Sequence, residues 1–158
     1  MIQKRITPFL WFDGNAEEAV NFYVSIFKNA SVKKMARYGE GGPGPKGTVM
    51  TASFELDGME FIALNGGPLY KFTEATSFVV NCESQEEVDH YWNALSEGGA
   101  KGRCGWLKDK FGLSWQVVPT ALVTLLSNKD AERSKKAMAA MMKMDKIDIA
   151  VLEEASNS

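Results

Sequence analysis

Residues 105–119 read GWLKDKFGLSWQVVP, in which two short apolar runs flank the turn sequence DKFG at 109–112. The runs predict two strands at 105–108 and 113–118, because aromatic and β-branched residues bounded by a turn signal are typical of a hairpin. One polar side chain, Gln116, interrupts the second apolar run. Its role, as a metal ligand, a substrate contact or a residue of the sheet, decides how the function is interpreted.

Two parts of the chain share a layout at an offset of 69 residues. At this offset Phe9 falls on Phe78, and Thr7 falls on Thr76. A short apolar run opens each copy, and an amphipathic segment follows it, which predicts a strand and then a helix. The chain therefore contains an internal repeat.

Both predicted helices carry the same start signals. Asn15 and Ser84 are good capping residues, because their side-chain oxygens can accept hydrogen bonds from the first-turn amides. Glu18 and Glu87 lie three residues later, where a glutamate completes a capping box.

Further strands are predicted in each copy, at 31–38, 48–56 and 59–64 in the first and at 101–104, 105–108 and 113–118 in the second. The result is an α+β chain with two tandem βαβββ units. The first module spans 3–67 and the second spans 74–119. Residues 120–158 form a helical C-terminal extension, with helices predicted at 121–126, 130–142 and 146–154.

Composition limits the classes of function. The 158 residues are 45% hydrophobic and 24% charged, which is typical of one soluble globular domain spanning 1–158. A net charge of −2 gives no basic surface for nucleic acid or a membrane, and no apolar run is long enough to span a bilayer. The two cysteines and the absence of an apolar leader favour a reduced, cytoplasmic location.

The sequences FLWFDGNAEEA at 9–19 and DKFGLSWQ at 109–116 resemble the PhnB-like branch of the vicinal oxygen chelate superfamily. This is the glyoxalase, bleomycin-resistance and dihydroxybiphenyl dioxygenase fold, and the branch often carries the label "3-demethylubiquinone-9 3-methyltransferase-like". The resemblance implies that the two βαβββ units curl into facing half-cups. It also implies a homodimer.

Active members of this superfamily hold a divalent metal with a His or Gln early in each first strand and a Glu in each last strand. Here the first-strand positions fall near 6–7 and 75–76, which offer only threonine hydroxyls. The last-strand positions fall at Ile62 or Ala63 and at Gln116. Divalent ions want several charged or imidazole donors, so we expect no metal and no other cofactor.

The methyltransferase label makes a prediction of its own. An S-adenosylmethionine enzyme of the Rossmann type needs a glycine-rich turn between a strand and a helix. The glycine cluster at 39–47 contains two prolines and precedes a predicted strand, which favours a hairpin loop, with a mobile lid as the alternative.

Two other side chains, a histidine and a cysteine, are of types that can be catalytic. His90 is the only histidine and lies off the apolar stripe of its helix, which favours a solvent-facing residue over a catalytic base. Cys104 is expected on a strand that could line the second cup, and an inert thiol is favoured there over a reactive thiolate.

Large aromatic walls with few polar groups are typical of small-molecule pockets, although they also build cores. The residues expected to line a ligand site are Trp11, Phe54, Asn65, Cys104, Trp106, Trp115 and Gln116. No catalytic residue is assigned.

The leading hypothesis is a protein that binds a small apolar or aromatic molecule without the usual metal. In it Trp side chains line the cup, and Gln116 and Asn65 position the ligand. The alternative is an isomerase, lyase, dioxygenase or methyltransferase of the superfamily with an atypical metal site. A third hypothesis is a structural dimer whose cups are filled by its own side chains.

Overall fold

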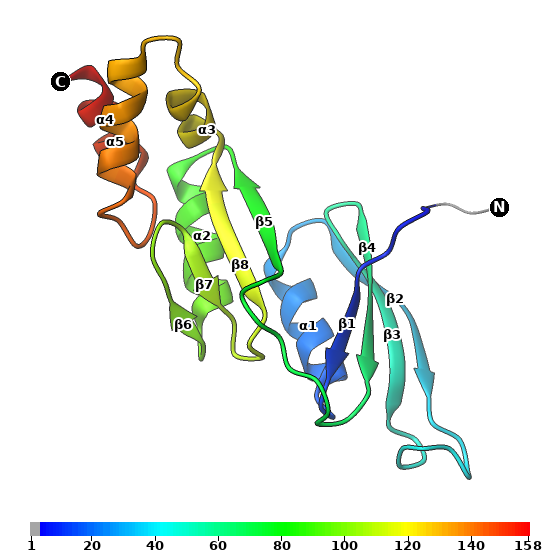
Figure 1. Ribbon diagram of the computed structural model, residues 1–158. Coiled ribbons are helices and arrows are strands. Elements are labelled where there is room, and N and C mark those ends of the chain that lie inside the picture. Colours follow the sequence, from blue (N-terminus) through cyan, green and yellow to red (C-terminus); the bar gives the residue numbers. More distant parts are fainter. Residues whose placement is uncertain (1–3) are drawn as a thin grey trace. The chain divides into compact units, whose positions relative to one another are not determined.

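A computed structural model describes residues 4–158 of the chain (Figure 1). The chain divides into two compact units, one ending at Phe72 and the other beginning at Thr73. Each unit contains one four-stranded sheet within the described residues, and three further helices follow the second sheet.

The first unit repeats the predicted strand–helix–strand order (Figure 1). Its sheet has the order β1-β4-β3-β2, in which β1 runs parallel to β4 and the other neighbours are antiparallel. The elements are β1 (Phe9–Phe12), α1 (Ala16–Ile26), β2 (Ala30–Arg37), β3 (Val49–Leu56) and β4 (Met59–Asn65).

Helix α1 and the sheet bury a common apolar core. Tyr23 of α1 stacks on Phe54 at a ring distance of 6.1 Å, and Phe54 stacks on Phe61 at 5.3 Å. Because side chains alternate along a strand, the neighbours of these residues point to the other face of the sheet. That open face carries Phe9, Trp11, Ile62 and Leu64.

The second unit has the same arrangement with shorter outer strands. Its sheet has the order β5-β8-β7-β6, with β5 parallel to β8. Its elements are β5 (Ser77–Cys82), α2 (Gln85–Ser96), β6 (Ala100–Lys101), β7 (Trp106–Lys108) and β8 (Ser114–Pro119). The core between α2 and this sheet contains Val88, Trp92 and Leu95 of the helix and Val80, Cys82, Trp115 and Val117 of the strands.

The C-terminal extension forms the helices α3 (Thr120–Leu126), α4 (Ala131–Met141) and α5 (Ile149–Asn157). They share a small core of Leu122, Ile147 and Leu152. The Gln85 side chain holds the start of α5 to α2, because it donates to the Ile147 carbonyl at 3.0 Å and accepts from the Ile149 amide at 2.9 Å. These short helices therefore rely on tertiary contacts rather than on their own propensity.

The helix caps differ between the two copies. Ser84 accepts from the Glu87 amide as predicted, and the Glu87 carboxylate reaches back to the Glu83 amide. The prediction for Asn15 is wrong, because its side chain makes no cap hydrogen bond. Asn65 on β4 supplies the missing acceptor: its Oδ1 lies 2.9 Å from the Ala16 amide.

The offset of 69 holds for the helices but not for the first strands. Two residues separate Phe12 from Asn15, whereas only Glu83 separates Cys82 from Ser84. The first strands therefore correspond at an offset of 70, which pairs the buried Phe12 with the buried Cys82. Phe9 lies on the open face and Phe78 on the helix-covered face, so their predicted equivalence is wrong.

Candidate functional site

Gln116 lies at the centre of the open face of the second sheet. Its Cα partners are Val79 on β5 and Trp106 on β7, so these three side chains stand in one row across the sheet. Val79 is 48% exposed, and Trp106 and Gln116 are half-buried. The row therefore presents an aliphatic and an aromatic surface on either side of one amide.

Two serines lie beside this row. The Gln116 amide Nε2 donates to the Ser77 hydroxyl at 2.9 Å. The Cα partner of Ser77 on β8 is Ser114, whose buried hydroxyl has no hydrogen-bond partner among residues 4–158. We call Ser77, Ser114 and Gln116 the polar cluster.

An unpartnered buried hydroxyl costs about 1–3 kcal/mol, because it gives up its hydrogen bonds to water without replacement. Buried polar groups usually have partners, so an exception such as Ser114 points to a group or molecule that completes its bonding.

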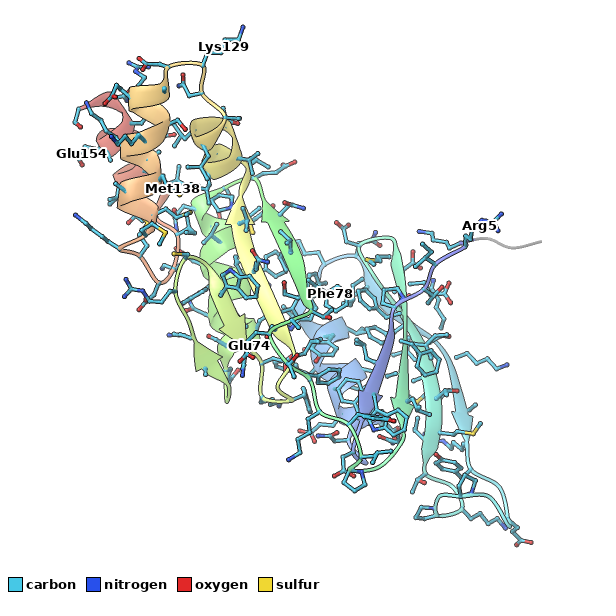
Figure 2. The ribbon with its side chains drawn as sticks, in the orientation of Figure 1. Arg5, Glu74, Phe78, Lys129, Met138 and Glu154 are labelled. Carbon is cyan, nitrogen blue, oxygen red and sulfur yellow. The ribbon has the colours of Figure 1, made fainter. Side chains whose placement is uncertain are left out.

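An ion pair borders the polar cluster. Glu74, which is labelled in Figure 2, precedes β5, and its carboxylate pairs with the Lys108 ammonium on β7. Lys108 is itself a Cα partner of Ser114, so the pair joins the two sides of β8 at the level of that serine. The hydrogen bond from Lys108 lowers the pKa of Glu74 below its usual value. The charge of Glu74 therefore offsets the positive charge of Lys108.

The turn between β7 and β8 is built on one buried carboxylate. Asp109 is 2% exposed, and its Oδ1 accepts from the amides of Phe111 at 2.9 Å and Leu113 at 3.0 Å. Its Oδ2 accepts from the Trp115 indole at 2.9 Å. These bonds fix the register in which Trp106 lies opposite Gln116.

Two of the expected wall residues belong to the cores instead. Phe54 is fully buried between Tyr23 and Phe61 in the first unit. Trp115 is 3% exposed, contacts Phe78 and alternates with Gln116 along β8, so its ring points toward α2. The sequence placed both on the right strands but did not resolve which face each occupies.

Trp11 lies on the open face of the first sheet, where its own chain contacts it. Its indole donates to the Gly67 carbonyl at 2.9 Å, and the Tyr70 ring meets it edge-on at 5.0 Å. A Cβ atom at Gly66 would lie 2.4 Å from the Trp11 ring, so only glycine allows this close approach. Trp11 anchors the segment that follows β4.

Asn65 holds three parts of the first unit together. Its Oδ1 accepts from Ala16, its Nδ2 donates to the Val49 carbonyl at 2.9 Å, and its backbone carbonyl accepts from the Tyr38 hydroxyl at 2.8 Å. Both the oxygen and the nitrogen of its side-chain amide are therefore bonded to the backbone of the first unit.

Cys104 lies in the turn between β6 and β7 rather than on a strand, with a left-handed φ of 56°. Its amide donates to the Met144 carbonyl at 2.9 Å, and its thiol to Met141 at 3.5 Å. Cys104 therefore faces the C-terminal extension. Cys82 is buried beneath α2, and burial raises its thiol pKa to about 12, so it stays protonated at neutral pH.

The corrected offset locates the positions where the resemblance places metal ligands. Gln116 corresponds to Ile62 in the last strands, and Ser77 corresponds to Thr7 in the first. Neutral hydroxyl and amide oxygens make a poor donor set for a divalent ion. Residues 4–158 also contain no group of three or more His, Cys, Asp or Glu side chains that could hold one. These positions do not fit the metal of the superfamily.

Sequence reasoning missed Ser77 and Ser114. The offset of 69 aligned Thr7 with Thr76 and so passed over Ser77 by one residue. The shorter connection before Ser84 was the signal that could have corrected it.

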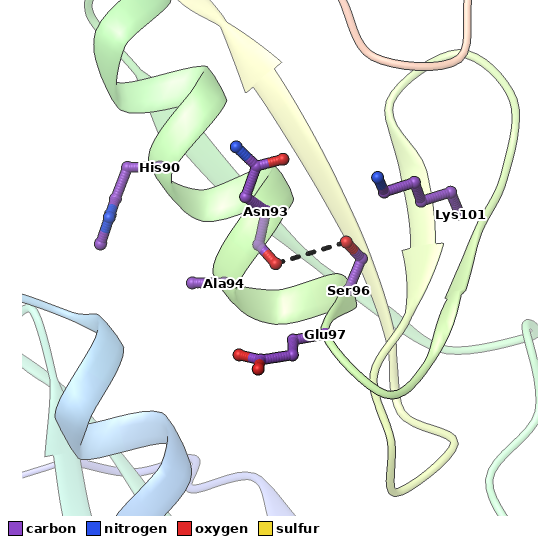
Figure 3. A pocket seen from close by; sticks show the side chains of 6 residues that line it. All are labelled: His90, Asn93, Ala94, Ser96, Glu97 and Lys101. Carbon is purple, nitrogen blue, oxygen red and sulfur yellow. Dashed lines mark hydrogen bonds between the residues drawn. The ribbon is translucent and has the colours of Figure 1, made fainter.

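His90 lies on the exposed side of α2, as predicted. It borders an open surface hollow with Asn93, Ala94, Ser96, Glu97 and Lys101 (Figure 3). The Ser96 hydroxyl is turned back to the Asn93 carbonyl rather than toward the hollow. This hollow lies outside the open sheet face that carries Gln116.

The fold and its open sheet faces define a class of protein. The chain is a member of the vicinal oxygen chelate superfamily, with the glyoxalase and bleomycin-resistance fold. Within it, residues 4–118 match the model of the 3-demethylubiquinone-9 3-methyltransferase family, and the chain belongs to that PhnB-like family. The match ends before α3.

Solved structures give the same assignment. A PhnB protein from Bacillus cereus, described as a 3-demethylubiquinone-9 3-methyltransferase, is 41% identical, with a TM-score of 0.69 over 73% of this chain and 99% of its own. Protein PA1353 from Pseudomonas aeruginosa is 26% identical, with a TM-score of 0.63 over 74% and 98%.

The fosfomycin resistance protein FosX from Listeria monocytogenes, solved with Mn(II) and sulfate, is 17% identical, with a TM-score of 0.52 over 75% and 91% of the two chains, and shares the fold. Among curated proteins, none matches this chain. Within residues 4–158 no helix has the length and hydropathy needed to cross a bilayer.

Proposed function

We propose that this protein binds a small apolar or aromatic molecule on the open face of its second sheet, without a metal ion. The observation that carries the proposal is the row Val79–Gln116–Trp106, in which an exposed aliphatic side chain and a half-buried indole flank one amide. Apolar surfaces with a few placed polar groups are the usual form of small-molecule sites.

The set of ligand contacts that we propose differs from the set expected from the sequence. Trp106 and Gln116 stay in it, and Val79, Ser77 and Ser114 join them. Phe54 and Trp115 are not proposed as ligand contacts because they are core residues. Asn65, Trp11 and Cys104 are not proposed because their polar atoms or rings bind other groups of their own chain. We propose that the protein acts as a homodimer in the cytoplasm, and that its two βαβββ modules are 3–67 and 74–119, followed by the extension 120–158.

The family description names a methyltransferase, and this chain gives little support to that chemistry. The glycine cluster at 39–47 connects β2 to β3 as a hairpin loop, closed by reciprocal backbone bonds between Tyr38 and residues 47–48. A glycine-rich turn that binds a nucleotide cofactor leads into a helix, whereas this loop leads into the strand β3.

Binding is tested with N-phenyl-1-naphthylamine, an uncharged probe whose fluorescence rises in apolar sites. We expect saturable binding of one probe per chain. Trp106→Ala should weaken it about fivefold to tenfold, since one aromatic contact contributes ~0.5–1.5 kcal/mol beyond its buried area. The matched control is Phe9→Ala on the first sheet, where Phe9 is 56% exposed. Loss of binding in the control alone would overturn the proposed location.

Metal dependence is tested on protein purified without chelator. Elemental analysis should find less than about a tenth of an equivalent of any transition metal or of Ca²⁺. Near-stoichiometric metal that disappears in Gln116→Ala would contradict the metal-free proposal and favour an atypical superfamily enzyme.

A further inference from the structure

The polar cluster has an uneven supply of donors and acceptors. The Ser77 oxygen already accepts from the Gln116 amide, which leaves its own hydroxyl hydrogen to donate. The Gln116 carbonyl oxygen accepts no hydrogen bond from residues 4–158. The Ser114 hydroxyl has neither a donor nor an acceptor partner among them. An incoming group therefore meets an open acceptor on Gln116 and the remaining hydroxyl hydrogen of Ser77. The Ser114 hydroxyl is fully buried in the free protein, and it becomes a further donor when the side chains that cover it move aside.

The charge around the cluster is balanced. Lys108, beside Ser114 on β7, is the nearest cation in the register of the sheet, and Glu74 already pairs with it. An anion entering here would need to displace Glu74 from Lys108. It would also place negative charge against the Gln116 carbonyl oxygen, which repels it.

From this arrangement we propose that the polar end of the ligand is an uncharged hydroxyl group carried on an aromatic ring. This proposal rests on the proposed function, because it specifies the chemistry of a ligand bound at that same face. The ligand hydroxyl donates to the Gln116 carbonyl and accepts from Ser114. The ring lies against Trp106 and Val79, the two neighbours of Gln116 in the sheet.

A carboxylate cannot reproduce this pattern, since it accepts hydrogen bonds at both oxygens and donates none. A bare hydrocarbon leaves the Ser114 hydroxyl as unpartnered as in the free protein. A comparison of a hydroxyl compound with a carboxylate and with a hydrocarbon therefore distinguishes a site that recognises the hydroxyl group from a general apolar surface.

The test is displacement of N-phenyl-1-naphthylamine by three compounds with the same ring system: 2-naphthol, 2-naphthoate and naphthalene. At neutral pH we expect 2-naphthol to bind at least tenfold more tightly than 2-naphthoate and at least threefold more tightly than naphthalene. Ser114→Ala should abolish the advantage of 2-naphthol over naphthalene and leave naphthalene binding within twofold.

Ser114→Ala also gives a readout that does not depend on a ligand. Removal of an unpartnered buried hydroxyl should leave the melting temperature of the free protein unchanged or raised by a few degrees, so weaker naphthol binding cannot reflect unfolding. Thr124→Ala on α3, where an exposed hydroxyl is removed, is the matched control and should leave the naphthol preference intact.

The outcomes separate the two proposals. If neither the probe nor any naphthalene compound binds, the proposed function fails. If 2-naphthoate binds most tightly and loses its advantage in Lys108→Gln, the face binds anions and the hydroxyl inference is wrong. If the three compounds bind equally, or Ser114→Ala leaves the naphthol preference intact, the inference is again wrong while apolar binding stands.

Discussion

Replacing Asp109 by Asn tests how the β7–β8 turn holds the candidate site. The carboxylate accepts three hydrogen bonds within the buried turn. An asparagine keeps one oxygen for the two turn amides but directs an NH₂ group at the Trp115 indole N–H, so one bond is lost. Hydrogen bonds to charged groups contribute ~1.5–3 kcal/mol, and we therefore expect Asp109→Asn to lower the free energy of unfolding by about 2 kcal/mol.

A double-mutant cycle isolates this bond. Trp115→Phe removes the indole N–H and also some apolar contact with Phe78. Each single variant loses the bond between Asp109 and Trp115, and the double variant loses the same bond only once, so its destabilisation should be smaller than the sum of the two. The coupling energy should be about 1–2 kcal/mol, within the range of residues in direct contact.

The assay is urea unfolding followed by circular dichroism, with exchange protection of the Leu113 amide as a local readout of the same turn. A destabilisation below about 0.5 kcal/mol for Asp109→Asn, or a coupling energy near zero, would refute the role of the carboxylate. Asp130→Asn at the start of α4 is a matched control, because that exposed cap keeps a side-chain acceptor after the change.

Three further predictions concern other parts of the chain. Asn65→Ala should destabilise the first unit by about 2 kcal/mol in urea unfolding, because two backbone groups lose their partners; an unchanged midpoint would contradict its scaffold role. In native protein at pH 8, iodoacetamide should modify Cys104 well before Cys82, by peptide mass spectrometry, since burial keeps the Cys82 thiol protonated; equal rates would refute this. The pair of Glu74 with Lys108 lowers the carboxyl pKa, so its stabilisation is present above pH 4.5 and is lost as pH falls through the lowered pKa. Lys108→Gln should return the pKa of Glu74, measured by NMR titration, toward 4.5, and an unchanged value would disprove the pairing.

Sequence periodicity and turn signals were enough to predict the strand–helix–strand order of both units. Buried residues recur along α1 and α2 at the spacing of a helix face, and the Asp57-Gly58 signal marks the observed β3–β4 hairpin. The resemblance carried by residues 105–119 predicted the family and the fold, and both are confirmed.

The faces of the strands could not be predicted as well, because a change of one residue in a connection moves a whole strand to the opposite register. The single residue Glu83 between β5 and Ser84 produced that change, and it hid the match of Ser77 with Thr7. Hydrogen bonds between residues far apart in the sequence could not be predicted either. Nothing near Asn15 in the sequence indicates that Asn65, 50 residues later, caps α1.

The central claim is that the open face of the second sheet binds an uncharged aromatic molecule without a metal. The most direct measurement is a ¹⁵N chemical-shift titration of the protein with 2-naphthol, before and after treatment with EDTA. The account predicts that the largest shifts fall on the Trp106 indole, the Gln116 side-chain amide and the backbone of Val79, and that EDTA changes none of them. Shifts confined to the first sheet, or a response that EDTA abolishes, would contradict it.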